Sequence, residues 1–308
     1  MATGFARNPG SERRVSVADA VVHNVVRNVV HPVVHSVVTP RRIAIAVTAV
    51  ALVVCYAPIL RGMFDQWWND EDMGHGMVVP IVILWIVWRE RKRWTSLPPQ
   101  PSWWGLALLA VAASVHFMSA MGAGLFAGSV AFVLSVAGAV LCLGGPAFFR
   151  TWAFPFLLAL FMLPKLAIVY NQVTLPLQLL ASRLAEVMLL AGGASVIREG
   201  NIIDAGGHRV AVAEACSGIR YLLSLGFVAV VFAYLSDAKP WMRMALLAAA
   251  VPVAILANAM RVAASASAPA LDAGALHAFC GCLVFVLCLA MLAFVRHLLN
   301  AAYARYHA

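Results

Sequence analysis

Charge is scarce in this chain. Only 11% of its 308 residues are charged, whereas 63% are hydrophobic. A water-soluble domain of this length would be difficult to keep in solution with so few charges, so the composition indicates a membrane protein. The formal net charge is +9. We interpret this excess as basic residues retained on the cytoplasmic side of a membrane, and we expect no nucleic-acid partner.

A secretory signal peptide is also not expected. The first apolar run starts only after Arg41-Arg42, and it is too long for the apolar part of a signal peptide. Residues 1–42 are a polar segment followed by a Val-Val doublet that recurs every four residues. Pro32 and Pro40 interrupt this pattern, so we expect a poorly ordered cytoplasmic tail without an assigned function.

Long apolar runs are abundant. Crossing the hydrocarbon of a bilayer as an α-helix takes about 20 residues, and the sequence contains eight runs near that length. They are 43–60, 77–88 (short, extended backward through His75), 103–121, 124–144, 150–169, 218–235, 243–262 and 277–295. The predicted fold is an all-α polytopic membrane protein with about eight transmembrane helices. These form one domain, 43–295, followed by a cytoplasmic tail, 296–308.

A more polar region separates the fifth and sixth runs. The stretch 174–192 carries Gln178, Arg183 and Glu186, which predicts an amphipathic helix lying at the membrane interface. Residues 196–212 have the β-branched and glycine pattern of a small hairpin. We expect both elements outside the membrane, immediately before the sixth span.

The basic residues give the orientation. Short loops rich in Lys and Arg stay in the cytoplasm. A basic cluster at 89–93 follows the second span, and basic residues also precede the fifth span and separate the sixth from the seventh. The loop 61–74 is acidic instead, and 264–276 has Asp272 as its one charged residue. Both termini are therefore predicted to be cytoplasmic.

Three residues with catalytic potential fall at the same end of three predicted spans. Cys216 lies at the start of the sixth span, Arg261 near the end of the seventh, and His277 opens the eighth. Because the chain reverses direction at each crossing, an antiparallel arrangement brings all three to the outer face. The positive end of a helix dipole favours a thiolate at Cys216. If that helix begins by residue 216, Arg220 lies one turn further on the same face.

Each of these residues also has a structural interpretation. Arg220 and Arg261 could anchor their helices at the interface, and His277 could be an interface histidine. Arg261 shares a helix face with Asn258, and an arginine at the edge of hydrocarbon is costly unless it is paired or functional.

The remaining cysteines favour no metal site. Cys55, Cys142 and Cys288 lie well inside apolar runs, where a thiol is a small hydrophobic group. Cys280 and Cys282 lie near His277, but 282 points away from the face shared by 277 and 280, and no second cluster completes four ligands. A disulfide between Cys216 and Cys280 is an open alternative on an oxidising face.

The segments that hold these residues resemble the motifs of the exosortase/archaeosortase family. The resemblance spans roughly residues 60–295. The matching segments are Glu214 to Leu222 with its Cys-Ser-Gly, Asn258 to Val262 with its Asn-x-x-Arg, His277 to Gly281, the pre-cysteine stretch Arg198 to Ile202, and the N-terminal signature Gly74 to Pro80. Cys282 departs from the pattern, because many members have an aromatic residue there.

The resemblance implies a membrane-embedded cysteine protease or transpeptidase of the bacterial cytoplasmic (inner) membrane. Such enzymes recognise proteins that carry a C-terminal sorting signal, which consists of a short motif such as Pro-Glu-Pro, a transmembrane helix and a basic cluster. By position, Cys216 matches the nucleophile, Arg261 the catalytic arginine and His277 the catalytic histidine. The residues expected to bind substrate or support catalysis are Arg220, Glu214, Asn258 and Ser217. The expected partners are these substrate proteins and the lipid bilayer, with no cofactor.

Two other functions remain open at this stage. One is a non-catalytic transporter or scaffold of exopolysaccharide export. Against a transporter, the sequence shows no inverted repeat and suggests no paired charges within the spans; the exception, Lys165 beside Pro164, is interpreted as a residue whose amine reaches the interface. The other is a protease that only hydrolyses its substrate, which would use the same residues as a transpeptidase.

Overall fold

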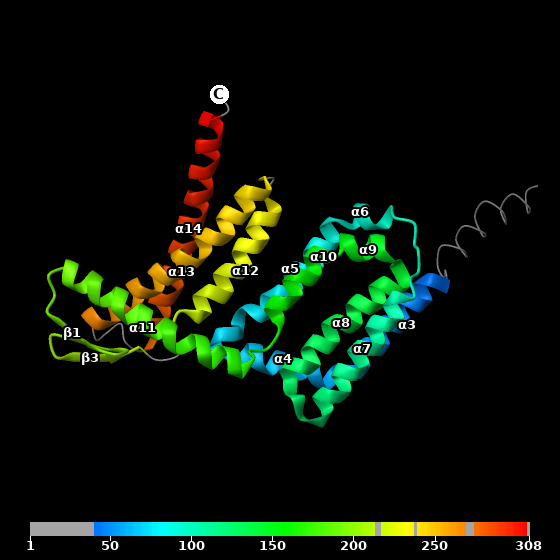
Figure 1. Ribbon diagram of the computed structural model, residues 1–308, viewed down its shortest axis with the longest axis horizontal. Coiled ribbons are helices and arrows are strands. Elements are labelled where there is room, and N and C mark those ends of the chain that lie inside the picture. Colours follow the sequence, from blue (N-terminus) through cyan, green and yellow to red (C-terminus); the bar gives the residue numbers. More distant parts are fainter. Residues whose placement is uncertain (1–39, 213–216, 237–238, 269–273, 307–308) are drawn as a thin grey trace, which may run out of the picture. The chain divides into compact units, whose positions relative to one another are not determined.

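The computed structural model describes residues 40–212, 217–236, 239–268 and 274–306. The chain divides into two compact units, Met1–Cys55 and Tyr56–Ala308. In the first unit the described part is helix α3 (Pro40–Cys55) (Figure 1), and most of the predicted tail lies outside the described residues. The predicted first span, 43–60, is two helices, because α4 begins anew at Ala57. Pro58 has no N–H for the helical hydrogen bond to Val54, which explains the interruption.

The second unit is mainly helical and contains one small sheet. In chain order its elements are α4 (Ala57–Asn69), η2 (Glu71–Met77), α5 (Val78–Arg89), α6 (Arg91–Thr95), α7 (Trp104–Met118), η3 (Ser119–Ala123), α8 (Gly124–Gly144), α9 (Pro146–Thr151), α10 (Ala153–Ala159), η4 (Leu160–Met162), α11 (Ala167–Ala191), β1 (Val196–Glu199), β2 (Ile202–Ala205), β3 (His208–Ala211), α12 (Ile219–Leu235), α13 (Pro240–Ser267) and α14 (Gly274–Tyr306).

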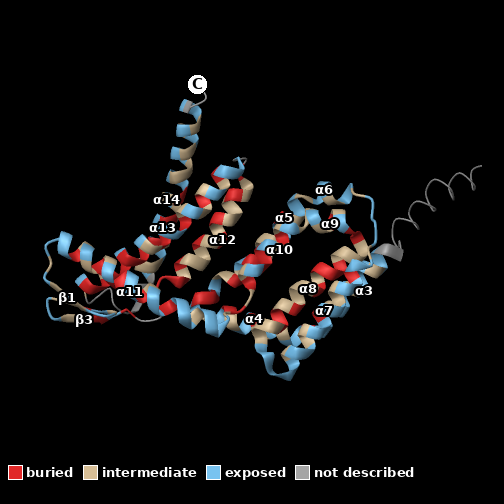
Figure 2. Ribbon diagram, in the orientation of Figure 1, coloured by how far each residue is buried: buried red, intermediate tan, exposed pale blue. Residues whose placement is uncertain are grey.

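Helices α12, α13 and α14 pack on one another and carry the predicted catalytic positions. Buried residues occur along these helices (Figure 2). Their contact surfaces include small side chains, and Ala229, Ala254 and Ala257 are almost fully buried. Small residues let membrane helices approach closely, which gives van der Waals packing where lipid offers no hydrophobic driving force. Helix α14 continues to Tyr306, so most of the predicted tail 296–308 is helical.

Helices α5 and α12 run in the same direction. At the starts of the two helices, Asp72 of η2, which precedes α5, accepts a hydrogen bond from Arg220 of α12. At their ends, Tyr234 of α12 donates a hydrogen bond to Glu90, which directly follows α5. They correspond to the predicted second and sixth spans, which cross the membrane in the same direction.

Helices α7 and α8 form an antiparallel hairpin. The chain turns at Gly122, which has a φ of 121° that an L side chain rarely adopts. At the open end of the hairpin the backbones touch: a Cβ on Gly105 would lie 2.3 Å from the amide nitrogen of Cys142. Gly105 is therefore required by the close approach of the two helices.

Replacing Gly105 with alanine should destabilise this hairpin. The new methyl group would overlap backbone atoms, which cannot move aside as a side chain can, and overpacking of this kind costs about 1–3 kcal/mol. Gly226→Ala in α12 is the matched control, because its Cβ would meet its nearest neighbour, Phe161, at 3.7 Å. We expect a lower thermal midpoint in detergent for Gly105→Ala alone; equal midpoints for the two variants would contradict the close packing.

The number of membrane spans differs from the prediction. Five helices are long and apolar enough to cross a bilayer, or six if α3 and α4 form one broken span. One of the five, Trp104–Gly144, is the α7–α8 hairpin, and α12 is shorter than this criterion. The predicted run 150–169 is interrupted, because the chain becomes extended at Leu163 before Pro164, as residues preceding proline tend to. A polytopic helical protein is confirmed, whereas eight spans are not.

Helix α11 replaces the predicted amphipathic helix and is longer than expected. Its 25 residues satisfy the length and hydropathy of a span. Both of its ends nevertheless contact the same end of the α12–α14 bundle. Tyr170 near its start hydrogen-bonds Asp72 beside α12, and Leu189 near its end packs in a cluster with Val262 and Ala266 at the end of α13. This placement fits a helix that lies across the end of the bundle (Figure 1), and the predicted position at the membrane interface stays a prediction.

The predicted hairpin is a three-stranded antiparallel sheet in the order β1-β2-β3. It is attached to α11: Arg198 donates to Glu186 at 2.6 Å, and Ser182 donates to the carbonyl of Gly200 at 3.0 Å. Asn201 holds the last strand through the carbonyl of Val212 at 3.1 Å. The pre-cysteine stretch therefore holds the chain at Val212, which directly follows β3.

Candidate active site

The predicted catalytic residues differ in how far the structure describes them. Cys216 and Glu214 lie outside the described residues. His277 is a residue of helix α14, but its side chain is also outside the described part. Arg261 is described completely and is buried, with 5% of its surface exposed.

Helix α12 begins later than the sequence analysis assumed. Its first residue is Ile219, and Gly218 before it has a φ of 90°, in the left-handed region that ends regular helix geometry. The backbone N–H of Ile219 donates to the hydroxyl of Ser217 at 3.4 Å. The sequence analysis placed Arg220 one turn beyond Cys216 on one helix face only if the helix began by residue 216, whereas α12 begins at Ile219.

The segment that follows Cys216 packs against α13 at Asn258. Ser217 is 2% exposed and Asn258 is 1% exposed. A Cβ on Gly218 would lie 3.0 Å from Cγ of Asn258, so the absence of a side chain at 218 permits this approach. Two of the predicted supporting residues, Ser217 and Asn258, therefore lie together where the start of α12 packs against α13.

Arg261 lies where the three motif segments meet. Its guanidinium carbon is 5.7 Å from the centre of the Tyr221 ring, in the first turn of α12. The Tyr221 hydroxyl donates to the carbonyl of Gly281 in α14 at 3.3 Å. A Cβ on Gly281 would be 3.7 Å from Nη2 of Arg261. Since Gly281 is one helical turn after His277, the buried arginine contacts both the helix that follows Cys216 and the helix that contains His277.

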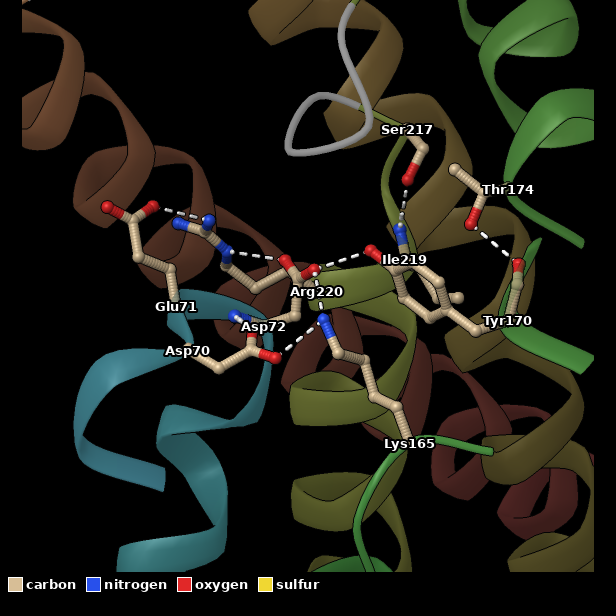
Figure 3. Close-up of polar contacts among 9 residues, drawn as sticks. All are labelled: Asp70, Glu71, Asp72, Lys165, Tyr170, Thr174, Ser217, Ile219 and Arg220. Atoms are coloured by element: carbon tan, nitrogen blue, oxygen red, sulfur yellow. Dashed lines mark hydrogen bonds and ion pairs between the residues drawn. The ribbon is translucent and has the colours of Figure 1, made fainter. Parts of the chain in front are cut away.

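Arg220 points to a different group of residues from Arg261. Its Nη2 atom is 2.6 Å from Oε2 of Glu71, and its Nε atom is 3.3 Å from Oδ1 of Asp72 (Figure 3). Glu71 and Asp72 belong to η2, just before the N-terminal signature that starts at Gly74. Arg220 is therefore engaged by carboxylates of the protein itself.

Asp72 is the centre of this polar cluster. Besides Arg220, its carboxylate accepts a hydrogen bond from the Tyr170 hydroxyl at 2.5 Å and one from the Lys165 amine at 3.3 Å (Figure 3). Lys165 also lies 2.6 Å from Asp70. Asp72 is 7% exposed, so these contacts compensate a buried negative charge. This ion-paired cluster was not predicted, and Lys165 is held by carboxylates rather than extending to the interface alone.

The sequence analysis missed Asp72, Lys165 and Tyr170 as members of one cluster. The acidic loop was used only to assign membrane orientation. The available signal was the run of three acidic residues, 70–72, which is separated only by Met73 from the Gly74-His75-Gly76 signature, in a segment that must bury some of its charge.

A cavity of about 570 Å³ lies beside this cluster. Its walls are mainly apolar and include Met73, Phe161 and Leu223, and its lining also includes Lys165 and Tyr170. Ile219, three residues after Cys216, also lines it. The cavity therefore extends from the polar cluster to the start of α12.

The cysteines that the structure describes carry free thiols, and Cys280 is one of them. The alternative of a disulfide between Cys216 and Cys280 is therefore not supported. Cys280 packs against the core of the α12–α14 bundle, and Cys288 is fully buried in it.

The helices and the buried charged residues at their ends define a multi-pass, helical membrane protein. The family model described as "Transmembrane exosortase" matches residues 67–294, a range that includes Cys216, Arg261 and His277. The chain belongs to this family, which confirms the resemblance noted in the sequence. No curated protein and no solved structure matches the chain.

Proposed function

We propose that this exosortase-family protein is a cysteine peptidase or transpeptidase that processes the C-terminal sorting signals of exported proteins. The observation that carries the proposal is the position of Arg261. A buried guanidinium touches the first turn of α12 and the helix of His277, at the junction next to the Cys216 segment. Buried cations at such junctions are costly and are retained where they perform a function.

The chemistry follows from these residue types. The Cys216 thiolate attacks a backbone carbonyl of the substrate, and the electrons of the C=O bond move onto the oxygen. Arg261 stabilises this oxyanion. His277 gives a proton to the leaving amine as the C–N bond breaks and a thioester forms. His277 then removes a proton from the acceptor, which attacks the thioester; the C–S bond breaks and the Cys216 thiolate is released beside the protonated His277.

The apolar cavity beside α12 supports binding of a membrane-anchored substrate. Its apolar walls suit the side chains where the substrate's transmembrane helix begins, and Ile219 in its wall places it near the Cys216 segment. The substrate's basic end would then reach the cytoplasmic side.

The charge distribution supports an active site on the external face of the bacterial cytoplasmic membrane, with both termini in the cytoplasm. The acidic η2 and its partners lie at one end of α5 and α12. Basic residues lie at the other end, where Arg93 pairs with Glu90, Lys239 contacts Tyr303 and Arg296 lies over Phe232. Basic ends remain in the cytoplasm.

Co-expression with a tagged reporter that ends in a Pro-Glu-Pro-type signal tests this function. We expect a shortened reporter, and a covalent enzyme–reporter adduct that neutral hydroxylamine releases, as it does thioesters. The mass of the new C-terminus distinguishes hydrolysis, which leaves a carboxylate, from transfer, which adds the acceptor. An unprocessed reporter with every signal encoded in the same genome would contradict the proposal.

A further inference from the structure

The cluster around Asp72 joins three segments that are far apart in the sequence. Asp72 and its partners Lys165, Tyr170 and Arg220 are separated by 93, 98 and 148 residues, respectively. Asp72 belongs to η2, Lys165 and Tyr170 lie around the start of α11, and Arg220 is in the first turn of α12 (Figure 3). Arg220 is four residues after Cys216, so whatever fixes Arg220 also fixes the start of the helix that follows the proposed nucleophile.

The two carboxylates that bind Arg220 are not equivalent. The Glu71 side chain is 79% exposed, whereas that of Asp72 is 9% exposed. An exposed ion pair contributes little because water screens it and its long side chains lose entropy. The buried contact is the stronger constraint, although its 3.3 Å separation is longer than the 2.6 Å separation of the exposed pair.

Asp72 also differs from Asp70. Asp70 contacts Lys165 and accepts the backbone N–H of Asp72 at 3.0 Å. Within the described residues, Asp72 is the one carboxylate that contacts both Lys165 and Arg220. Loss of its charge would leave Lys165 with Asp70 and Arg220 with Glu71, but would remove the charged group that joins the two cations.

We propose that Asp72 is a positioning residue of the active site: through Arg220 it holds the first turn of α12, and with it the chain that leads from Cys216. This inference rests on the proposed function. It assigns the acidic start of η2, just before the N-terminal signature, a role in aligning the nucleophile with Arg261 and His277. It also makes Arg220 a residue that is bound by the protein itself instead of by the substrate.

Asp72→Asn should lower kcat about 100-fold with little change in KM, because a misplacement of about 1 Å in a reacting group has effects of this size. Glu71→Gln is the matched control, since it removes the other carboxylate from the same arginine; we expect its kcat within about twofold of wild type. The measurement is the rate of reporter processing by the full-length enzyme in proteoliposomes.

A double-mutant comparison separates positioning from general destabilisation. If Asp72 acts through Arg220, Asp72→Asn/Arg220→Gln should be about as slow as the slower single variant, because residues that act as one unit are not additive. A double variant whose loss of kcat equals the product of the two single losses would overturn the proposal. If the Asp72→Asn protein does not accumulate, Arg220→Lys is the substitute test. Lysine keeps the positive charge but lacks the paired nitrogen atoms of the guanidinium, so a wild-type kcat in Arg220→Lys would also overturn the proposal.

The outcomes also separate this inference from the proposed function. Processing lost in Cys216→Ala but normal in Asp72→Asn would reject the positioning role alone. Processing retained in Cys216→Ala would reject the cysteine mechanism on which that role depends.

Discussion

Cys216→Ala should abolish processing while the protein remains in the membrane. Without the thiol no thioester can form, and removal of a covalent nucleophile typically lowers the rate by about 10⁴-fold or more. Cys216→Ser should be nearly as inactive, because a serine hydroxyl is a far weaker nucleophile than a thiolate at neutral pH. The measurement is the amount of shortened reporter, together with the hydroxylamine-sensitive adduct, at equal enzyme abundance.

Cys280→Ser is the matched control for this experiment. Cys280 carries a free thiol and packs beside the α12–α14 core, so the change tests whether any thiol in this region matters. Because the Cys280 thiol is small and partly buried, its replacement by a serine hydroxyl should leave the rate of processing within about threefold of wild type. Processing that depends on Cys280 instead of Cys216 would move the nucleophile to α14.

Arg261→Gln should lower kcat by about 10²–10³-fold, the loss that follows removal of a single donor to an oxyanion. Glutamine keeps a polar group of similar length in a site that is 5% exposed, but it has no charge. Arg261→Lys should recover part of the loss, because the charge is retained while the planar guanidinium is not. The measurement is kcat and KM for reporter processing, together with the thermal midpoint in detergent.

Arg296→Gln provides a matched arginine at the opposite end of the bundle. Arg296 also belongs to a long apolar helix, and its guanidinium lies over Phe232 at 5.0 Å, comparable to the 5.7 Å of Arg261 over Tyr221. A similar cation–π contact is therefore lost in both variants, so similar thermal midpoints with unequal kcat values indicate a chemical role for Arg261. Equal losses of activity in both variants would indicate that Arg261 is structural.

Much of the fold class could be predicted from local sequence. A low charge content and long apolar runs require backbone hydrogen bonds to be satisfied within helices, so the helical membrane class follows from composition. The length of each helix was less predictable. Single prolines interrupt two of the apolar runs, at Pro58 and Pro164, and a hydropathy pattern does not register a lost N–H donor.

The candidate site was also predicted in part, because the positions of its residues along the apolar runs can be read from the sequence. The prediction that Cys216, Arg261 and His277 share one face of the membrane comes from counting reversals of the chain along the sequence. The described contacts of Arg261 with Tyr221 and with the Gly281 position agree with that arrangement. The catalytic roles of the three residues remain predictions.

The sequence by itself determined the membrane class, the family and the motif positions, because these depend on composition and on residues that are neighbours in the chain. Only the tertiary structure decided which charges pair. The contact of Asp72 with Arg220 joins residues 148 positions apart, and no local pattern specifies such a partner. It follows from the packing of η2 and the start of α11 against α12, where a buried carboxylate is stable only with cations and a hydroxyl beside it.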